Sequence, residues 1–113
     1  PQMDLIFSNS FNALKPGGLL GVVEHRAKPG TSMEAMKKSG YVTEEHAIEV
    51  AKKHGFILVA KSEINANPKD TADHPGGVWT LPPNYRLKEK DKEKYKAIGE
   101  SDRMTLLFKK SSL

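Results

Sequence analysis

Three ionisable residues in a row, Glu24, His25 and Arg26, follow an apolar run and offer the first chemistry in the chain. An imidazole with a pKa near neutrality can act as a general base, and a guanidinium can hold an anionic substrate group. The structural alternative is an ion network that pins strand ends, with Arg26 or Arg103 paired to Asp102 or to the neighbouring glutamate. We take His25 as the candidate catalytic residue, and Glu24 and Arg26 as candidate substrate contacts.

A long polar stretch, residues 65–102, lies between two apolar runs and is rich in proline and glycine. A connection of this length within one domain usually serves as a lid or a binding loop, and we call it the excursion. Its motif DHPGGVWTLPP is expected to close over a ligand, or else Trp79 anchors the excursion to the domain. The further candidate substrate contacts are Asn65, His74, Trp79, Asp102 and Arg103.

Hydrophobic periodicity predicts the first elements that position these residues. Apolar side chains spaced by three and four over residues 3–14 predict a helix, which Pro16-Gly17-Gly18 ends. Residues 19–23 are apolar at nearly every position, which is typical of a strand covered on both faces. Residues 28–40 are expected to form a loop with a short helix.

The second half of the pattern repeats helix and strand. Thr43 is a good N-cap for a helix that stops at Gly55, and residues 56–60 follow at once as a strand. After the excursion, residues 104–108 form the last strand. The order helix, strand, helix, strand, excursion, strand predicts a single α/β domain over residues 1–113.

Composition limits the class of protein. The chain has 113 residues and no cysteine, which leaves room for one domain and excludes disulfides and thiolate metal sites. No run is long enough to cross a membrane, so a cytoplasmic protein is expected. The histidines and carboxylates lack the spacing of a known metal motif, and no metal site is expected. The net charge of +4 comes largely from residues 86–96, where six basic and three acidic side chains alternate as on a solvated surface.

Three segments, ALKPGGLLGVVEH, KKHGFILVAKSE and DRMTLLFKK, resemble the C-terminal half of a class I S-adenosylmethionine-dependent methyltransferase. More narrowly, they are similar to a bacterial group of predicted methyltransferases with unassigned substrate. The resemblance implies part of a Rossmann-like sheet in which the three strands are strands five, six and seven. They would lie in the order five, seven, six, with the last strand antiparallel and helices alongside. Such a fold brings the ends of the strands, and the candidate residues there, to one edge of the sheet.

The chain departs from that family in one respect. It has no glycine-rich turn between a strand and a helix, so no cofactor-binding residue is assigned. We therefore expect a fragment of a methyltransferase for a small-molecule acceptor. S-adenosylmethionine would belong to the full-length parent, and the isolated chain would bind none and be inactive. Without its neighbour, the strand over residues 19–23 has an open edge, which predicts a homo-oligomer. The alternatives are a non-catalytic oligomeric binding module and, with less support, a nucleic-acid-binding domain.

Overall fold

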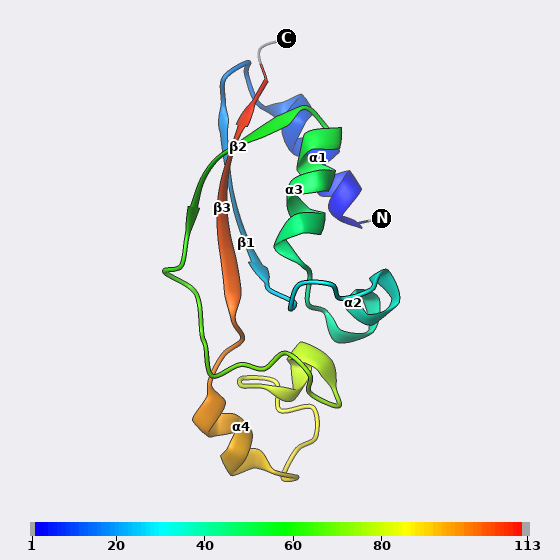
Figure 1. Cartoon of the computed structure of the whole chain (residues 1–113), viewed down its shortest axis with the longest axis vertical. Helices are drawn as coiled ribbons and strands as arrows, with labels where there is room; N and C mark the ends of the chain where they lie inside the picture. The colour runs from blue at the N-terminus through cyan, green and yellow to red at the C-terminus, as the bar shows by residue number, and fades with distance from the viewer. Residues whose placement is uncertain (1, 112–113) are drawn as a thin grey trace.

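A three-stranded antiparallel sheet runs parallel to the long axis in the computed structural model, which describes residues 2–111, and α4 lies beyond one end of the sheet (Figure 1). The strand order is β1-β3-β2, so the last strand in the chain lies between the other two and is antiparallel to both. This is the order expected for the three predicted strands. The elements are α1 (Gln2–Ala13), β1 (Leu19–His25), α2 (Met33–Ser39), α3 (Glu44–Lys53), β2 (Phe56–Ser62), the 3-10 helix η1 (Gly77–Thr80), α4 (Lys92–Ile98) and β3 (Arg103–Lys110).

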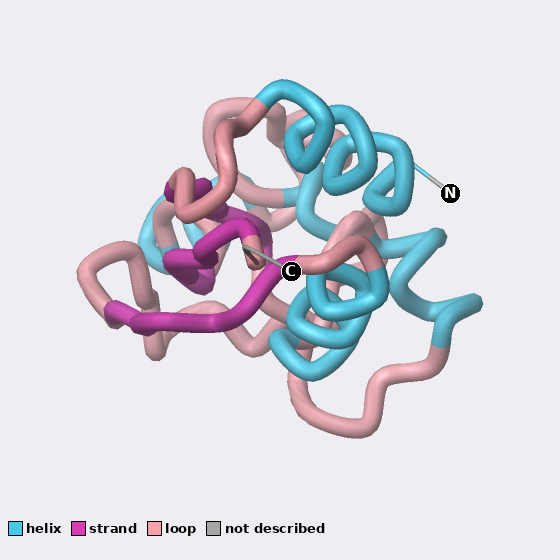
Figure 2. Tube along the Cα trace, turned by 90° about the horizontal axis from the view of Figure 1, so that it is seen from above, coloured by secondary structure: helices cyan, strands magenta, loops and turns pink. Residues whose placement is uncertain are grey.

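Helices α1 and α3 cover one face of the sheet, as the view from above shows (Figure 2). Along β3, Met104, Leu106 and Phe108 point to this face and are fully buried. The opposite face is open, because Leu19 and Val23 of β1 are 58% and 54% exposed. The prediction that both faces of residues 19–23 are covered is therefore wrong for the described chain. β1 is apolar at nearly every position, yet helices cover only one of its faces.

Aromatic rings hold the helices to the sheet. Phe7 of α1 packs edge-on against Phe108 of β3, with ring centroids 5.7 Å apart. Phe56 of β2 contacts both of these rings and also meets Phe11 edge-on at 5.7 Å. Such offset and edge-to-face contacts add to the free energy of burying the rings. One aromatic cluster thus joins α1 to β2 and β3 on the covered face of the sheet.

The ends of the helices meet the strands through specific contacts. Lys110 at the end of β3 donates hydrogen bonds from Nζ to the carbonyls of Phe11 and Leu14, at 2.5 and 2.7 Å. Phe11 is in the last turn of α1 and Leu14 directly follows the helix, where backbone carbonyls have no partners within the helix. Gly55 ends α3 with φ +92°, and a Cβ there would lie 2.5 Å from the Phe11 ring. Both the backbone conformation and the close packing therefore require glycine.

Truncating the central aromatic side chain tests this account of the core. We expect Phe108→Ala to lower the free energy of unfolding by about 3–5 kcal/mol, because it opens a cavity between α1 and the sheet. Ile57→Ala is the control, since Ile57 lies on the open face and is 54% exposed. Urea unfolding monitored by circular dichroism measures both. An equal loss of stability in the two variants would contradict the one-sided core.

Candidate functional site

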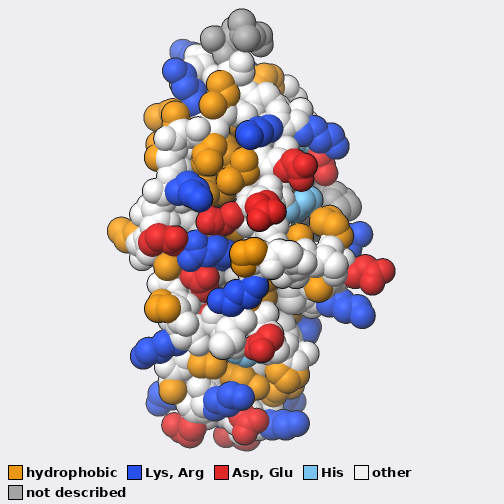
Figure 3. Space-filling model, viewed as in Figure 1, with side chains coloured by type: hydrophobic (Ala, Val, Ile, Leu, Met, Phe, Trp, Pro, Cys, Tyr) orange, Lys and Arg blue, Asp and Glu red, His pale blue; other side chains and the backbone are white. Residues whose placement is uncertain are grey.

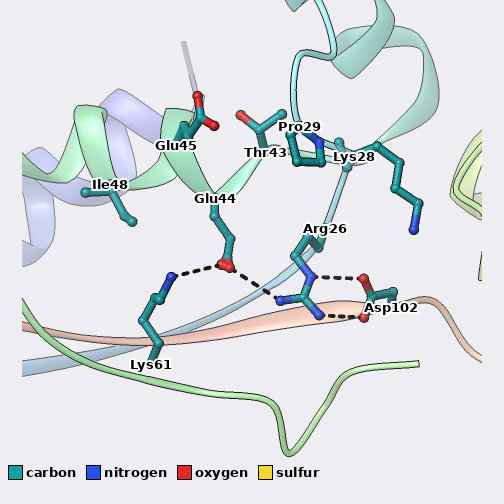
Figure 4. A pocket seen from close by; sticks show the side chains of 10 residues that line it. Arg26, Lys28, Pro29, Thr43, Glu44, Glu45, Ile48, Lys61 and Asp102 are labelled. Atoms are coloured by element: carbon teal, nitrogen blue, oxygen red, sulfur yellow. Dashed lines mark hydrogen bonds and ion pairs between the residues drawn. The ribbon is translucent and has the colours of Figure 1, made fainter. Parts of the chain in front are cut away.

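Arg26, just after β1, is the centre of an ion cluster at the end of the sheet (Figure 4). Its Nε and Nη2 donate to the two carboxylate oxygens of Asp102 at 2.9 and 2.8 Å, a bidentate pair. Nη1 also reaches Glu44 of α3 at 3.3 Å and Glu63 after β2 at 2.9 Å. Three carboxylates from three segments therefore share one guanidinium, which is the ion network named above as the structural alternative.

Partial burial makes this pair electrostatically strong. The hydrogen bonds that Arg26 donates to Asp102 raise the pKa of Arg26 above its ordinary value and outweigh the opposing effect of burial. Burial alone would raise the pKa of Asp102, but bonds from Arg26 and from the backbone N–H of Asn67 hold that pKa below its ordinary value. The Arg26 and Asp102 side chains are 18% and 12% exposed. Both groups are thus charged across the physiological pH range.

A cavity of about 480 Å³ opens beside the cluster. Figure 4 shows Glu45 and Ile48 of α3, with the N-cap residue Thr43, on one side of it and Lys61 of β2 on the other. Lys61 lies 3.8 Å from Glu44, so its charge is already paired. The cavity wall also carries Lys28 and Glu45, and neither side chain forms an ion pair within residues 2–111. The pairs that Glu44 makes with Arg26 and Lys61 join α3 to the ends of β1 and β2.

His25, the predicted base, has different surroundings from its neighbour Arg26. Its Nδ1 lies 2.5 Å from the hydroxyl oxygen of Ser101, which is buried. Nε2 of His25 has no hydrogen-bond partner among residues 2–111. Every buried side-chain nitrogen or oxygen in that range does have a partner, so Nε2 is accessible to solvent. A cavity of about 290 Å³ adjoins it, lined by Val23, Glu24, His25 and Arg103.

Burial lowers the pKa of His25 below its ordinary value, and Arg103 adds to this effect while Glu24 opposes it. The imidazole is therefore neutral at pH 7. A neutral ring with one nitrogen held by a hydroxyl and the other open to solvent is suited to accept a proton. This geometry fits a general base.

A buried carboxylate, Asp70, ties the excursion to the body of the domain. Asp70 is fully buried and accepts hydrogen bonds from the Tyr41 hydroxyl at 2.8 Å and from the Asp102 N–H at 2.9 Å. His74 Nε2 lies 2.8 Å from its other oxygen, and the His74 side chain is only 4% exposed. Burial raises the pKa of Tyr41 above its ordinary value, and the bond to Asp70 adds to this. His74 is thus enclosed by protein, which favours a structural role over ligand contact.

The other predicted contacts also bond within the chain. Trp79 is half-buried beside Gly40 and lies under the Arg86 guanidinium, 4.9 Å from the ring centroid. This favours the alternative in which Trp79 anchors the excursion. Asn65 accepts from the Arg103 N–H at 3.1 Å and donates from its side chain to Thr105 at 2.8 Å, which aligns the start of β3. Their roles in substrate binding stay predictions.

Sequence reasoning missed several residues that build this end of the molecule. Ser101 and Asp70 were not assigned these roles, because each lies in a polar stretch and its partner in the body of the domain, His25 or Tyr41, is more than 25 positions away. Tyr41 followed a glycine in an apparent loop, yet it is 1% exposed. For Glu44, the first-turn position of α3 explained the charge and concealed its second role in the Arg26 cluster.

Several other classes of site find no support in the described part of the chain. Across residues 2–111, no three or more His, Asp or Glu side chains are grouped as a metal site requires. None of the helices described has the length and apolar character that a membrane crossing demands. On the face seen in Figure 3, basic and acidic side chains are interspersed, unlike the single-sign surface of a typical nucleic-acid-binding face.

Comparison with known proteins shows the fold. A crystal structure of a proposed sarcosine dimethylglycine methyltransferase from Galdieria sulphuraria matches with a TM-score of 0.59 and 16% identity. The match covers 99% of this chain and 49% of that protein, so the chain spans about half the length of its structural neighbour. No family model and no curated protein sequence matches. The chain has a small α/β structure like part of a methyltransferase fold.

The Arg26–Asp102 pair gives a pH-dependent prediction. Because folding lowers the pKa of Asp102, the pair stabilises the fold above the unfolded pKa of about 3.9 and stops doing so as pH falls through the folded pKa. Asp102→Asn should lower the free energy of unfolding by about 2 kcal/mol at pH 7. Urea unfolding at a series of pH values should show the difference from wild type shrinking below pH ~4.

Glu100→Gln is the matched control for that experiment. It removes the charge of Glu100, which pairs with Arg103 at 2.8 Å. The Glu100 side chain is 64% exposed. An exposed pair of this kind should contribute less than about 1 kcal/mol. A larger loss in Glu100→Gln than in Asp102→Asn would contradict the importance given to Asp102.

Proposed function

We propose that this chain is the acceptor-side part of an S-adenosylmethionine-dependent methyltransferase that acts on a small molecule. The observation that carries the proposal is the match of 99% of the chain to about half of a methyltransferase structure. The same match supports assigning β1, β2 and β3 to strands five, six and seven of such a sheet. The bacterial family relationship and the fragment status suggested by the sequence belong to this proposal.

The residues described here do not fit the cofactor. Within residues 2–111, no strand leads through a glycine-rich turn into a helix; the link from β1 to α2 contains a single glycine, Gly30. Such a turn is what brings backbone N–H groups close to a bound nucleotide. We therefore assign no residue of this chain to S-adenosylmethionine, and its binding would fall to another part of the enzyme.

On this proposal, the chain's own contribution is to align the acceptor and remove its proton. Methyl transfer is a displacement that depends on the alignment of the reacting atoms and the exclusion of water. His25, neutral at pH 7 and open at Nε2, would take the acceptor's proton, with Ser101 orienting the ring. Glu24 and Arg103 line the adjoining cavity and would contact the acceptor.

Two measurements test the fragment proposal. We expect calorimetric titration of this chain with S-adenosylmethionine to give no binding heat, because residues 2–111 contain no glycine-rich turn between a strand and a helix. We also expect the coding sequence upstream of Pro1 to encode a strand followed by a glycine-rich turn. Tight binding of S-adenosylmethionine by the chain alone would contradict the assignment.

The proposed base predicts a pH profile for methyl transfer in a protein that includes the cofactor-binding part. Only neutral His25 accepts a proton, so kcat should be constant above its pKa, which lies below about 6.5, and fall as pH decreases through it. His25→Gln should lower kcat by about a hundredfold and remove that step. His54→Gln, at the end of α3 and outside the wall of each cavity described, is the control and should keep the wild-type profile.

The second candidate function is a non-catalytic oligomeric module, and the free edge of β1 favours it. At the two ends of the β1–β3 ladder, Lys110 N–H donates to Gly18 O and Arg26 N–H to Asp102 O, both at 2.8 Å. Hydrogen bonding alternates along an antiparallel pair, so Leu19, Gly21 and Val23 direct their N–H and C=O groups to the free edge. An edge of this kind can pair with another copy of the chain.

A proline at the edge separates this candidate from a monomer. The Val23 N–H points away from β3, so Val23→Pro is compatible with the folded chain but removes a donor needed for edge pairing. Analytical ultracentrifugation should show a dimer for wild type and for the control Val23→Ala, and a monomer for Val23→Pro. A monomeric wild type across a wide range of concentration would rule the module out.

A further inference from the structure

A second large cavity, of about 530 Å³, lies on the covered side of the sheet next to the free edge of β1. It is bounded by the first half of α1, the end of β1, α2 and the first turn of α3. Its volume is within the range of pockets that hold small molecules. The apolar side chains that line it include Met3, Phe7, Val22, Met33, Met36 and Val42.

Methionines give this cavity its character. Three of the chain's four methionines line it, and the fourth, Met104, is fully buried in the core and is not part of its wall. Methionine side chains are flexible and polarisable, so they adapt to apolar ligands of different shape. Met33 is 45% exposed and stands at the opening, while Met36 is 9% exposed and lies deeper. The cavity therefore has an adaptable apolar interior with access from solvent.

One carboxylate, Glu24, lies in the wall of this apolar cavity. Its Oε1 accepts a hydrogen bond from the His25 N–H at 3.0 Å. Among residues 2–111, no Lys, Arg or His nitrogen lies within ion-pair distance of Glu24, in contrast to the fully paired Asp102. Since all buried side-chain oxygens in that range have partners, Oε2 of Glu24 is accessible from solvent. A half-buried carboxylate oxygen is thus available to a ligand.

Two other ionisable side chains face the cavity, Lys37 of α2 and His46 of α3. Lys37 is exposed, so water and salt screen its ammonium group. His46 is half-buried and donates its backbone N–H to Thr43 at 3.1 Å as part of the α3 cap. Glu24 is therefore the charge that selects among ligands in the cavity.

We propose that this cavity binds a small organic cation, an alkyl- or arylammonium ion. Its apolar part would lie among Met33, Met36 and Phe7, and its N–H groups would donate to Oε2 of Glu24. Hydrogen bonds between two ionised groups are stronger than neutral ones, and an anion in the same place would be repelled by Glu24. This binding does not depend on the proposed function, which places the methyl acceptor in the separate cavity beside His25.

Three probes of matched shape test the charge preference: hexylammonium, hexanol and hexanoate. Each is titrated into the chain labelled with ¹³C at the methionine methyl groups, and binding is followed by NMR. The Met33 and Met36 signals should shift, and the Met104 signal should move least. We expect hexylammonium to bind about tenfold more tightly than hexanol, and hexanoate to bind most weakly. Absence of a shift with hexylammonium, or equal binding of hexanoate, would overturn the proposal.

Variants test whether Glu24 causes the preference for hexylammonium. Glu24→Gln should abolish the advantage of hexylammonium over hexanol while hexanol still binds. Glu49→Gln, an exposed residue of α3 outside the cavity, removes the same charge and should keep the advantage. Met33→Trp should block all three probes by filling the opening. A preference for the cation that survives Glu24→Gln would also overturn the proposal.

These results are distinguishable from a failure of the proposed function. Binding of hexylammonium without methyl transfer by any longer form of the protein would remove the methyltransferase proposal and leave the cation site. If a longer form of the protein transfers a methyl group and this chain does not bind hexylammonium, the cation site is ruled out and the methyltransferase proposal remains.

Discussion

Asp102, the residue before β3, is the point through which the sheet, α3 and the excursion are held together. Its backbone carbonyl accepts from Arg26 and its backbone N–H donates to Asp70. Its carboxylate takes the Arg26 guanidinium and the N–H of Asn67. Since a partly buried carboxylate is costly without partners, these bonds allow β3 to enter the sheet at one defined register. The central strand, β3, is thereby tied to the excursion that precedes it in the chain.

The sheet divides the molecule into surfaces with different physical properties. Its covered side holds the aromatic cluster of Phe7, Phe56 and Phe108 and accounts for most of the core. Its open side exposes apolar side chains of β1 and β2, which a folded domain rarely leaves in contact with water without a partner or ligand. Stability and interaction therefore lie on opposite faces of the same three strands.

The end of β1 shows how three adjacent side chains can have three different roles. Arg26 is fully occupied by carboxylates, His25 has one nitrogen held and one free, and Glu24 keeps an oxygen available beside an apolar cavity. Alternation along the strand directs neighbouring side chains to opposite faces, so the three are separated although they are consecutive. Binding and proton transfer can then take place near one another without competing for the same charge.

A methyltransferase fold does not by itself specify a substrate, because one fold supports many activities. At 16% identity the structural neighbour shows how this chain folds, and its reaction enters only as a proposal. What favours chemistry at the end of β1 is local: a histidine whose pKa is lowered by burial, beside a cavity, with a hydroxyl to orient its ring. Such perturbed groups are common at functional sites and also occur in structural networks.

The sequence by itself determined the elements outside the excursion, whereas η1 and α4 lie within the stretch expected to be a loop. The apolar stripe of residues 3–14, the Thr43 cap, the stop at Gly55 and the three strands all appear at the predicted places, because caps, glycines and periodicity act over a few residues. Only the tertiary structure decided which face of β1 is covered and which charges are paired. Leu19 is apolar in either case, and its exposure depends on which segments pack across it. The bond between His25 and Ser101 joins residues 76 positions apart, so it exists only once β3 has entered the sheet.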